Sequence, residues 1–339
     1  MDTIKYIFSS LFSNKKIIDE SKTRPWYLAI IIGLLSLIVS AVPFLTSGLS
    51  VHGSDILLAN ENYNIDYSLL QFSKEIYEDD KIKIEIVDQN LVCEGLNEVK
   101  EITYDNPSTT EVENKITLLV YYVATDGEVT QARNTLKMRY PASDNPAVST
   151  VYSTLIFTKT SVFLNLYKEG TTVTFANGAI TEDVPAENTV STTGSFEDIE
   201  DDYKNIKYFH TSNHKNTWNM WCKFFDQAYA PVGVSSTFLL VGMTLGMNLL
   251  IVLIMSLTLF LISRGKRSIR KYNYLEALKM VFFSLLSPAI IALILSYIMP
   301  SLMQMGFVMC VVLRITWLGM KATSPEDGPA PTQRTAVRK

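Results

Sequence analysis

Residues 232–263 read VGVSSTFLLVGMTLGMNLLIVLIMSLTLFLIS, which is 32 positions without a formal charge. A helix needs about 20 apolar residues to cross the hydrocarbon core of a bilayer, so this run is long enough for one span. A second uncharged run of 34 residues, 280–313, is long enough to contain parts of two spans. A third covers 26–54. The sequence therefore predicts a membrane α-helical protein with four transmembrane helices, one plus three.

A long polar segment separates the first predicted span from the other three. The predicted order is a cytoplasmic amphipathic lead at 1–25, a transmembrane helix at 26–45, an α+β domain at 46–230, a second transmembrane helix at 235–263, a basic cytoplasmic loop at 264–274, a third helix at 275–299, a fourth at 302–320 and a disordered cytoplasmic tail at 321–339. The first span exceeds the 7–15-residue apolar core of a signal peptide, which favours an uncleaved anchor.

Charge is divided unevenly along the chain and predicts its orientation. The net charge is −4, but residues 46–230 hold 28 acidic and 14 basic side chains, while the remainder holds 6 acidic and 16 basic ones. Residues 264–271 contain five cations and no acid. Lys and Arg near membrane ends stay in the cytoplasm, so we expect a cell-membrane protein with cytoplasmic termini and an extracytoplasmic 46–230. An acidic external domain argues against a nucleic-acid partner.

The lead has apolar side chains at helical spacing. Ile4, Ile7, Phe8, Leu11 and Phe12 fall on one face of a predicted helix. Such a segment is typical of a helix lying on the inner leaflet. Periodicity alone does not distinguish this placement from a short helix packed on protein, so both interpretations stay open.

The 46–230 domain mixes strand and helix patterns without a regular βα alternation, which favours an α+β fold. The expected elements are strands at 82–87 and 116–124, a capped helix from Asn145-Pro146 to Ile156, a hairpin of 161–167 with 171–175 and a turn at Asn177-Gly178. Residues 189–202 are expected to form a solvated linker or the start of a helix. A final helix carries Trp218, Trp221, Cys222, Phe225 and Tyr229 near one face. That face suits the outer membrane interface or, as a rival interpretation, the domain core.

Four groups inside the second and third spans draw attention. Asn248 lies near the middle of its span, where an amide needs an interhelical hydrogen bond. Gly242 and Gly246 form a Gly-x-x-x-Gly face that permits close helix approach. Pro288 is expected to kink the third span or to leave a free carbonyl for a neighbouring helix.

Arg314 is the one charge between residues 280 and 320. A charged group in a span is a functional candidate, although snorkelling to the inner interface is the simpler alternative. Glu276, at the inner start of the third span, is the nearest acid. We expect Glu276 and Arg314 to pair and to hold the third and fourth spans together.

The domain offers little catalytic chemistry. His210 and His214 have the i, i+4 spacing of zinc ligands on a helix, and Cys222 follows, but a structural zinc site needs four ligands. No nucleophilic triad or phosphate-binding loop is present, so the sequence predicts no enzyme, no cofactor and no metal. Cys93 and Cys222 either pair or serve as separate small hydrophobic residues.

The arrangement resembles a known family. Phe8-Ser9-Ser10-Leu11-Phe12 and Lys15-Lys16-Ile17-Ile18 precede a span that ends near Val42-Pro43, and a large external domain then leads to three closely spaced spans. This pattern is similar to uncharacterised multi-pass membrane proteins of low-GC Gram-positive bacteria and their wall-less relatives, some of which are labelled maltodextrin-utilisation proteins. The resemblance covers the topology and implies no catalytic residues.

The sequence and the resemblance together predict a non-enzymatic membrane accessory protein. Its external domain would contact a partner or a still unknown ligand, and its helix bundle would lie in the lipid bilayer against another membrane protein or a second copy. The resemblance implies a link to carbohydrate uptake. The alternative is a small-solute carrier or channel subunit formed by the bundle, and a membrane-bound enzyme ranks last.

Overall fold

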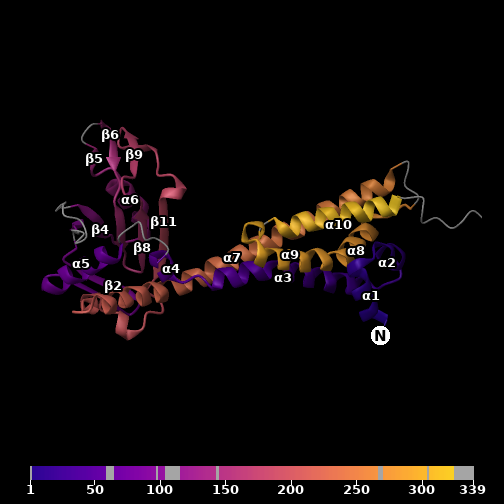
Figure 1. Ribbon diagram of the computed structural model, residues 1–339, viewed down its shortest axis with the longest axis horizontal. Helices are drawn as coiled ribbons and strands as arrows, with labels where there is room; N and C mark the ends of the chain where they lie inside the picture. The colour runs from indigo at the N-terminus through magenta and orange to yellow at the C-terminus, as the bar shows by residue number, and fades with distance from the viewer. Residues whose placement is uncertain are drawn as a thin grey trace, which may run out of the picture. The chain divides into compact units, whose positions relative to one another are not determined.

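The structure is a computed structural model that describes residues 2–58, 65–96, 98–103, 115–142, 145–265, 270–303 and 305–323 (Figure 1). The chain divides into two compact units. The α+β unit is Ser50–Ser235, and the helical unit is Met1–Leu49 with Ser236–Lys339. The fold is therefore a mixed α+β fold with long apolar helices, and each unit is described by itself.

A sheet in the strand order β11-β8-β7-β4-β3 organises the described part of the α+β unit. Its strands are β3 (Lys100–Thr103), β4 (Ile116–Tyr122), β7 (Ser153–Phe157), β8 (Ser161–Tyr167) and β11 (Thr189–Ser195). β4 and β7 pair in parallel, and the other neighbours pair antiparallel. Side chains alternate between the two faces, so Leu118 and Val120 enter one core while Leu119 enters another.

Helices cover both faces of this sheet. On one face lie α5 (Ile65–Glu78), the β1–β2 hairpin (Lys83–Val87 and Asn90–Glu94) and the first part of α7 (His214–Arg264), whose buried side chains form one core with the sheet. On the other face α6 (Val129–Lys137) buries Val129, Ala132 and Leu136. These three positions recur at helical spacing, which explains why one side of α6 packs on the sheet.

A second sheet has the strand order β10-β9-β6-β5. Its strands are β5 (Pro141–Ala142), β6 (Asn145–Thr150), β9 (Thr172–Ala176) and β10 (Ala179–Glu182). β9 and β10 form a hairpin around Asn177 and Gly178, both of which have positive φ. The turn expected at this dipeptide is confirmed, since two-residue hairpin turns of this type require positive φ at both positions.

Several elements of the α+β unit differ from the sequence prediction. The helix expected from Asn145-Pro146 to Ile156 is wrong, because these residues form β6 and β7. The solvated linker or helix start expected at 189–202 is also wrong over 189–195, where β11 pairs with β8 along its whole length. The strands expected at 82–87, 116–124 and 161–167 are confirmed. The expected hairpin of 161–167 with 171–175 is not formed, because β8 and β9 join different sheets.

The aromatic segment at 218–229 is part of α7 and packs in the core of the α+β unit. Trp221, Phe224 and Phe225 are buried there, and the Trp221 indole N–H donates to Ser73 Oγ at 2.8 Å. The rival interpretation, core packing, is therefore the correct one. An indole that is buried needs a partner for its N–H, and Ser73 on α5 supplies it.

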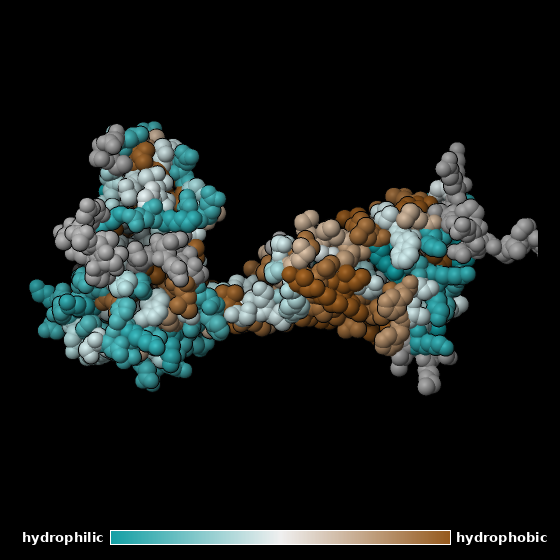
Figure 2. Space-filling model, in the orientation of Figure 1, coloured by the Kyte–Doolittle hydropathy of each residue, from teal (hydrophilic) through white to brown (hydrophobic). Residues whose placement is uncertain are grey.

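The helical unit contains α1 (Asp2–Phe12), α2 (Asn14–Glu20), α3 (Trp26–Leu49), the remainder of α7, α8 (Tyr274–Ser284), α9 (Leu286–Ile298) and α10 (Gly306–Thr323). α3 packs along α8 and α9, and α10 packs along α9. Large apolar side chains point outward, among them Ile31, Leu34 and Ile38 on α3 and Leu239, Leu250 and Leu261 on α7. Figure 2 shows this as a brown band on the helical unit. Such exposure is compatible with a membrane location, where lipid covers these faces.

Among the described residues, two helices, α3 and α7, are long and apolar enough to cross a membrane. The bent pair α8 and α9 makes a third if it is one span. α3 begins at the expected Trp26 and continues past residue 45, and α10 begins four residues after the predicted start of the fourth span. The fourth span stays a prediction. The disordered tail expected at 321–339 is wrong at 321–323, which end α10, and the rest of it lies outside the described residues.

The bend between α8 and α9 is 40° and has an identifiable cause. Pro288 has no N–H, so the carbonyl of Ser284 four residues earlier has no helical donor. α8 ends at Ser284, and the Leu285 N–H bonds to Phe282 in a tighter turn. The kink expected from Pro288 is therefore confirmed, one turn before the proline itself.

Cys93 on β2 and Cys222 on α7 are both free thiols, so the pairing considered from sequence is not formed.

Burial raises the pKa of Cys93 to about 12. Because the thiolate is the nucleophile, we expect iodoacetamide at pH 8 to label folded Cys93 far more slowly than the urea-unfolded chain. In the unfolded chain, Cys93 loses its proton at the ordinary pKa of a thiol, whereas in the folded chain it keeps the proton. The free energy of unfolding should therefore also fall as the pH rises above that ordinary pKa. Mass spectrometry of the labelled peptide measures the rates, and equal rates in both states would contradict the prediction.

Candidate functional site

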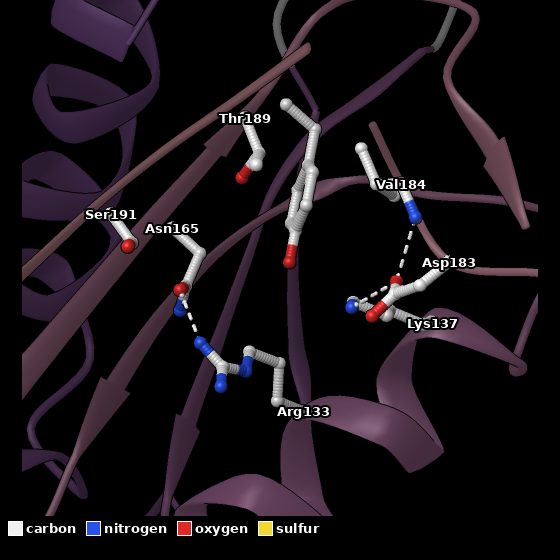
Figure 3. A pocket seen from close by; sticks show the side chains of 8 residues that line it. Arg133, Lys137, Asn165, Asp183, Val184, Thr189 and Ser191 are labelled. Carbon is white, nitrogen blue, oxygen red and sulfur yellow. Dashed lines mark hydrogen bonds and ion pairs between the residues drawn. The ribbon is translucent and has the colours of Figure 1, made fainter. Parts of the chain in front are cut away.

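A polar cavity of about 180 Å³ lies in the α+β unit beside α6. Its lining residues come from α6, β8, β11 and the segment after β10; they are Arg133, Lys137, Asn165, Tyr167, Asp183, Val184, Thr189 and Ser191 (Figure 3). Arg133 and Lys137 are four residues apart on α6, so both side chains leave the same side of the helix. The apolar face of α6 on the sheet thus places two cations at one cavity.

Two consecutive hydrogen bonds hold the Arg133 side chain in place. Its Nη1 donates to Asn165 Oδ1 at 2.8 Å, and Asn165 Nδ2 donates to Thr154 Oγ1 at 3.2 Å. Asn165 and Thr154 are directly opposite each other on β8 and β7, and both are buried. Since each amide group of Asn165 has a partner, its orientation is fixed, and it fixes the guanidinium in turn.

Lys137 and Asp183 form an ion pair at the other side of the cavity. Lys137 Nζ lies 2.6 Å from Asp183 Oδ1, and the Lys137 side chain is 8% exposed while that of Asp183 is 60% exposed. The Val184 N–H also donates to Asp183 Oδ1 at 2.7 Å. Burial alone would raise the pKa of Asp183, but the hydrogen bonds from Lys137 and Val184 and the nearby cations outweigh it and hold this pKa below its usual range. Asp183 is therefore ionised at neutral pH and neutralises Lys137.

The remaining wall supplies neutral hydrogen-bonding groups. Burial raises the pKa of Tyr167 to about 12, so its phenol keeps its proton at neutral pH. Thr189 and Ser191 are two residues apart on β11 and face the same side of the sheet. The cavity thus combines one cation that has no acidic partner among the described residues, Arg133, with phenol and hydroxyl groups. This set of groups can bind an anion or a polar ligand, whereas it lacks a nucleophile paired with a base.

Asn248 makes the interhelical bond that the sequence predicted. Its Nδ2 donates to Ser40 Oγ at 3.1 Å, which joins α7 to α3, and both side chains are buried. We expect a double-mutant cycle of Asn248→Leu and Ser40→Ala to give a coupling energy of about 0.6 kcal/mol, the average for such bonds in membranes. Unfolding in mixed detergent with the Ser40→Ala and double variants checks this. Strict additivity of the two substitutions would contradict a direct bond.

Arg314 and Glu276 do not pair, so that hypothesis is wrong. Arg314 is buried on α10, and its Nη2 donates to the Ser10 carbonyl on α1 at 2.9 Å. Glu276 instead caps α8 by accepting from the Asn273 N–H at 3.0 Å, and it lies 3.5 Å from Lys22 Nζ. Glu276 therefore caps the N-terminus of its own helix, and Arg314 binds the N-terminal lead.

The lead packs on the rest of the helical unit. Tyr6, Ile17 and Ile18 are buried in the same core as α8 and α10, while Phe8 and Phe12 are exposed. Asp19 lies 2.8 Å from Arg270 Nη1, which adds an ion pair between the lead and the segment before α8. One face of the lead therefore packs on protein, as the second interpretation expected, and its other face carries exposed aromatic residues.

Gly242 and Gly246 do not mediate a close helix contact within the described chain. A Cβ added at either position would meet nothing within 4 Å. The close approaches are on α3, where a Cβ at Gly33 would lie 2.7 Å from Phe282 Cδ1 and one at Gly48 would lie 2.4 Å from Thr237 Oγ1. Small residues do permit close packing here, but the helix that uses them is α3.

The two histidines do not share a helix face. His210 precedes α7, and His214 is its first residue. The His210 ring lies 5.3 Å from that of Tyr77, and the His214 ring stacks 5.2 Å from that of Tyr67. Within the described ranges there is no group of three or more His, Cys, Asp or Glu residues that could hold a metal ion.

The sequence did not point to the residues of the cavity. Arg133 and Lys137 have helical spacing within VTQARNTLK, and Asn165 interrupts the apolar strand SVFLNLY, so two signals were present. Neither signal indicates that α6 lies over β8, because the contact depends on how the strands pair.

No protein-family model, curated protein or solved structure matches this chain.

Proposed function

We propose that this chain is a non-enzymatic integral membrane accessory protein with an external binding domain. Four spans, at 26–45, 235–263, 275–299 and 302–320, would anchor it in the cell membrane with both termini in the cytoplasm. The segment 46–230 would then lie outside and contact a ligand or partner. The helices would dock on another membrane complex or a second copy, with a link to carbohydrate uptake that rests on the family resemblance alone.

The cavity beside α6 is the observation that carries the binding role. It belongs to a unit with its own core, and its polar groups converge on one space. In the helical unit, by contrast, Asn248 and Arg314 each have a hydrogen bond inside the protein. Polar groups that line a transport path would instead face a water-filled cavity. This difference favours binding by the α+β unit and anchoring by the helices.

The test of the accessory role is crosslinking in intact cells followed by purification in mild detergent. We expect one membrane protein to be captured in fixed proportion to the full chain, and Tyr208→Ala, at an exposed side chain, is a neutral control. A crosslinked preparation that contains only monomer would overturn the proposal. Orientation is tested in parallel, because protease added outside should digest 50–235 and spare 264–274.

The alternative is a small-solute carrier or channel subunit. The bent pair α8 and α9 favours it, because interrupted helices line substrate sites in many transporters. Flux of a solute into proteoliposomes that is lost in Asn248→Leu would support the carrier or channel hypothesis. Equal flux in empty and protein-containing vesicles would dismiss it.

A further inference from the structure

We propose that the cavity beside α6 binds a small hydroxylated carboxylate, such as a sugar acid or hydroxy acid, with its carboxylate on Arg133. The proposal rests on the proposed function in taking the α+β unit as the ligand-binding part. It adds the chemical class of the ligand and the group that recognises it. Three features of the cavity support it: the N–H donors of Arg133 that the protein does not use, the net positive charge of the lining and the hydroxyl groups of β11.

Arg133 has binding capacity that the protein does not use. A guanidinium carries five N–H donors in one plane, and one of its bonds goes to Asn165. No ion pair joins Arg133 to an acid anywhere in the described ranges, while its charge acts on both Asp183 and Tyr167. Asp183, the acid in the cavity lining, forms its ion pair with Lys137, so the charge and the remaining donors of Arg133 can still attract an anion.

The geometry of Arg133 favours a carboxylate. Asn165 accepts from Nη1, and the edge formed by Nε and Nη2 has no hydrogen bond to the described residues. That edge presents two parallel N–H groups that match the two oxygens of a carboxylate. Figure 3 shows Arg133 extended from α6 to Asn165, with the Lys137–Asp183 pair on the other side of the cavity. The guanidinium is thus oriented before the ligand arrives.

The charge balance favours a single negative charge. Asp183 neutralises Lys137 at 2.6 Å, so the cavity has one uncompensated positive charge. A monoanion makes the occupied cavity neutral, whereas a dianion such as hydrogen phosphate would leave it with one net negative charge. The cavity volume of about 180 Å³ limits the ligand to a small molecule.

Hydroxyl groups of the protein favour hydroxyl groups on the ligand. Thr189 and Ser191 line the cavity from β11, and Tyr167 adds a buried ring and a phenol that stays protonated. Hydroxyls both donate and accept hydrogen bonds, so they suit a polyhydroxylated ligand. Thr189 already bonds to the Tyr167 phenol, so Ser191 is the lining hydroxyl that a hydroxylated ligand would add a bond to, and a plain apolar acid would not use it.

The simpler explanation is that Arg133 only satisfies the buried amide of Asn165. A binding measurement separates the two ideas. Calorimetry of the full chain in mild detergent would use D-glucuronate, acetate, inorganic phosphate and neutral D-glucose as probes. We expect saturable binding of glucuronate, weaker binding of acetate and none of glucose.

Variants assign the binding to the cavity. Arg133→Gln is expected to weaken glucuronate binding about tenfold or more, as loss of a charged hydrogen-bonded pair does. Arg139→Gln removes the same charge from an exposed residue outside the cavity and should change nothing. Ser191→Ala should weaken glucuronate and leave acetate unchanged. The Ser191 variant keeps the test decisive if Arg133→Gln disturbs folding, since Ser191 is exposed on its strand.

The outcomes are distinct. Equal affinity in the wild type and in folded Arg133→Gln, no saturable binding of either carboxylate, or tighter binding of phosphate than of glucuronate would each overturn the assignment. If the crosslinked membrane partner is still captured while no carboxylate binds, this inference fails and the accessory function stands. If glucuronate binds but no membrane partner is captured, the accessory function fails and the assignment of the ligand stands.

Discussion

Trp221→Ala is expected to lower the free energy of unfolding of the α+β unit by about 3–5 kcal/mol, the usual cost of removing a large aromatic side chain from a core. Trp221 is fully buried. Its ring lies 5.1 Å from that of Phe209 and 5.7 Å from that of Phe224. The substitution would leave a cavity and would also remove the N–H that Ser73 Oγ accepts.

Pulse proteolysis of the full chain in urea measures this effect without using tryptophan fluorescence. Tyr208→Ala is the matched control, because this large aromatic side chain is 63% exposed in the same unit. Its loss should cost well under 1 kcal/mol, as surface substitutions usually do. A Trp221 variant as stable as the Tyr208 variant would mean that the aromatic cluster does not hold α7 to the sheet.

Gly48→Leu is expected to destabilise the helical unit by about 1–3 kcal/mol, the typical cost of overpacking. A Cβ at Gly48 would lie 2.4 Å from Thr237 Oγ1 and 2.6 Å from Thr237 Cγ2. Thr237 is buried on α7, so it has little room to move away. The two helices must therefore separate, and thermal unfolding in detergent should show a lower transition temperature.

Gly246→Leu provides the comparison on the neighbouring helix. A Cβ at Gly246 meets open space, and leucine has a higher helix propensity than glycine by up to about 1 kcal/mol. We therefore expect this variant to be as stable as the wild type or slightly more stable. Equal losses at Gly48 and Gly246 would contradict the packing of α3 on α7, whereas a loss at Gly246 that depends on protein concentration would indicate a contact between two chains.

The cavity shows why a site of this kind is hard to predict from one sequence. Arg133 and Lys137 are readable as neighbours on a helix, because i, i+4 spacing fixes them on one side. Asn165 and Thr154 are neighbours only because β7 and β8 pair in one particular register. A shift of one residue would turn Asn165 to the opposite face of the sheet and away from α6. The site therefore depends on strand pairing between segments that are adjacent in sequence but whose alignment has no local signal.

The sequence by itself determined the apolar helices and the position of the bend. Uncharged runs of bilayer length can satisfy their backbone groups in lipid only as helices, and Pro288 removes one helical hydrogen bond wherever it lies. The tertiary structure alone decided that 145–157 forms strands, that β8 pairs with β11, and that Arg314 binds Ser10 and not Glu276. Apolar spacing at Val148, Val151 and Leu155 fits a helix as well as a strand, so partners far along the chain make the choice. Hydrogen bonds between strands and between helices form only once these segments meet, and no local pattern encodes which of them will meet.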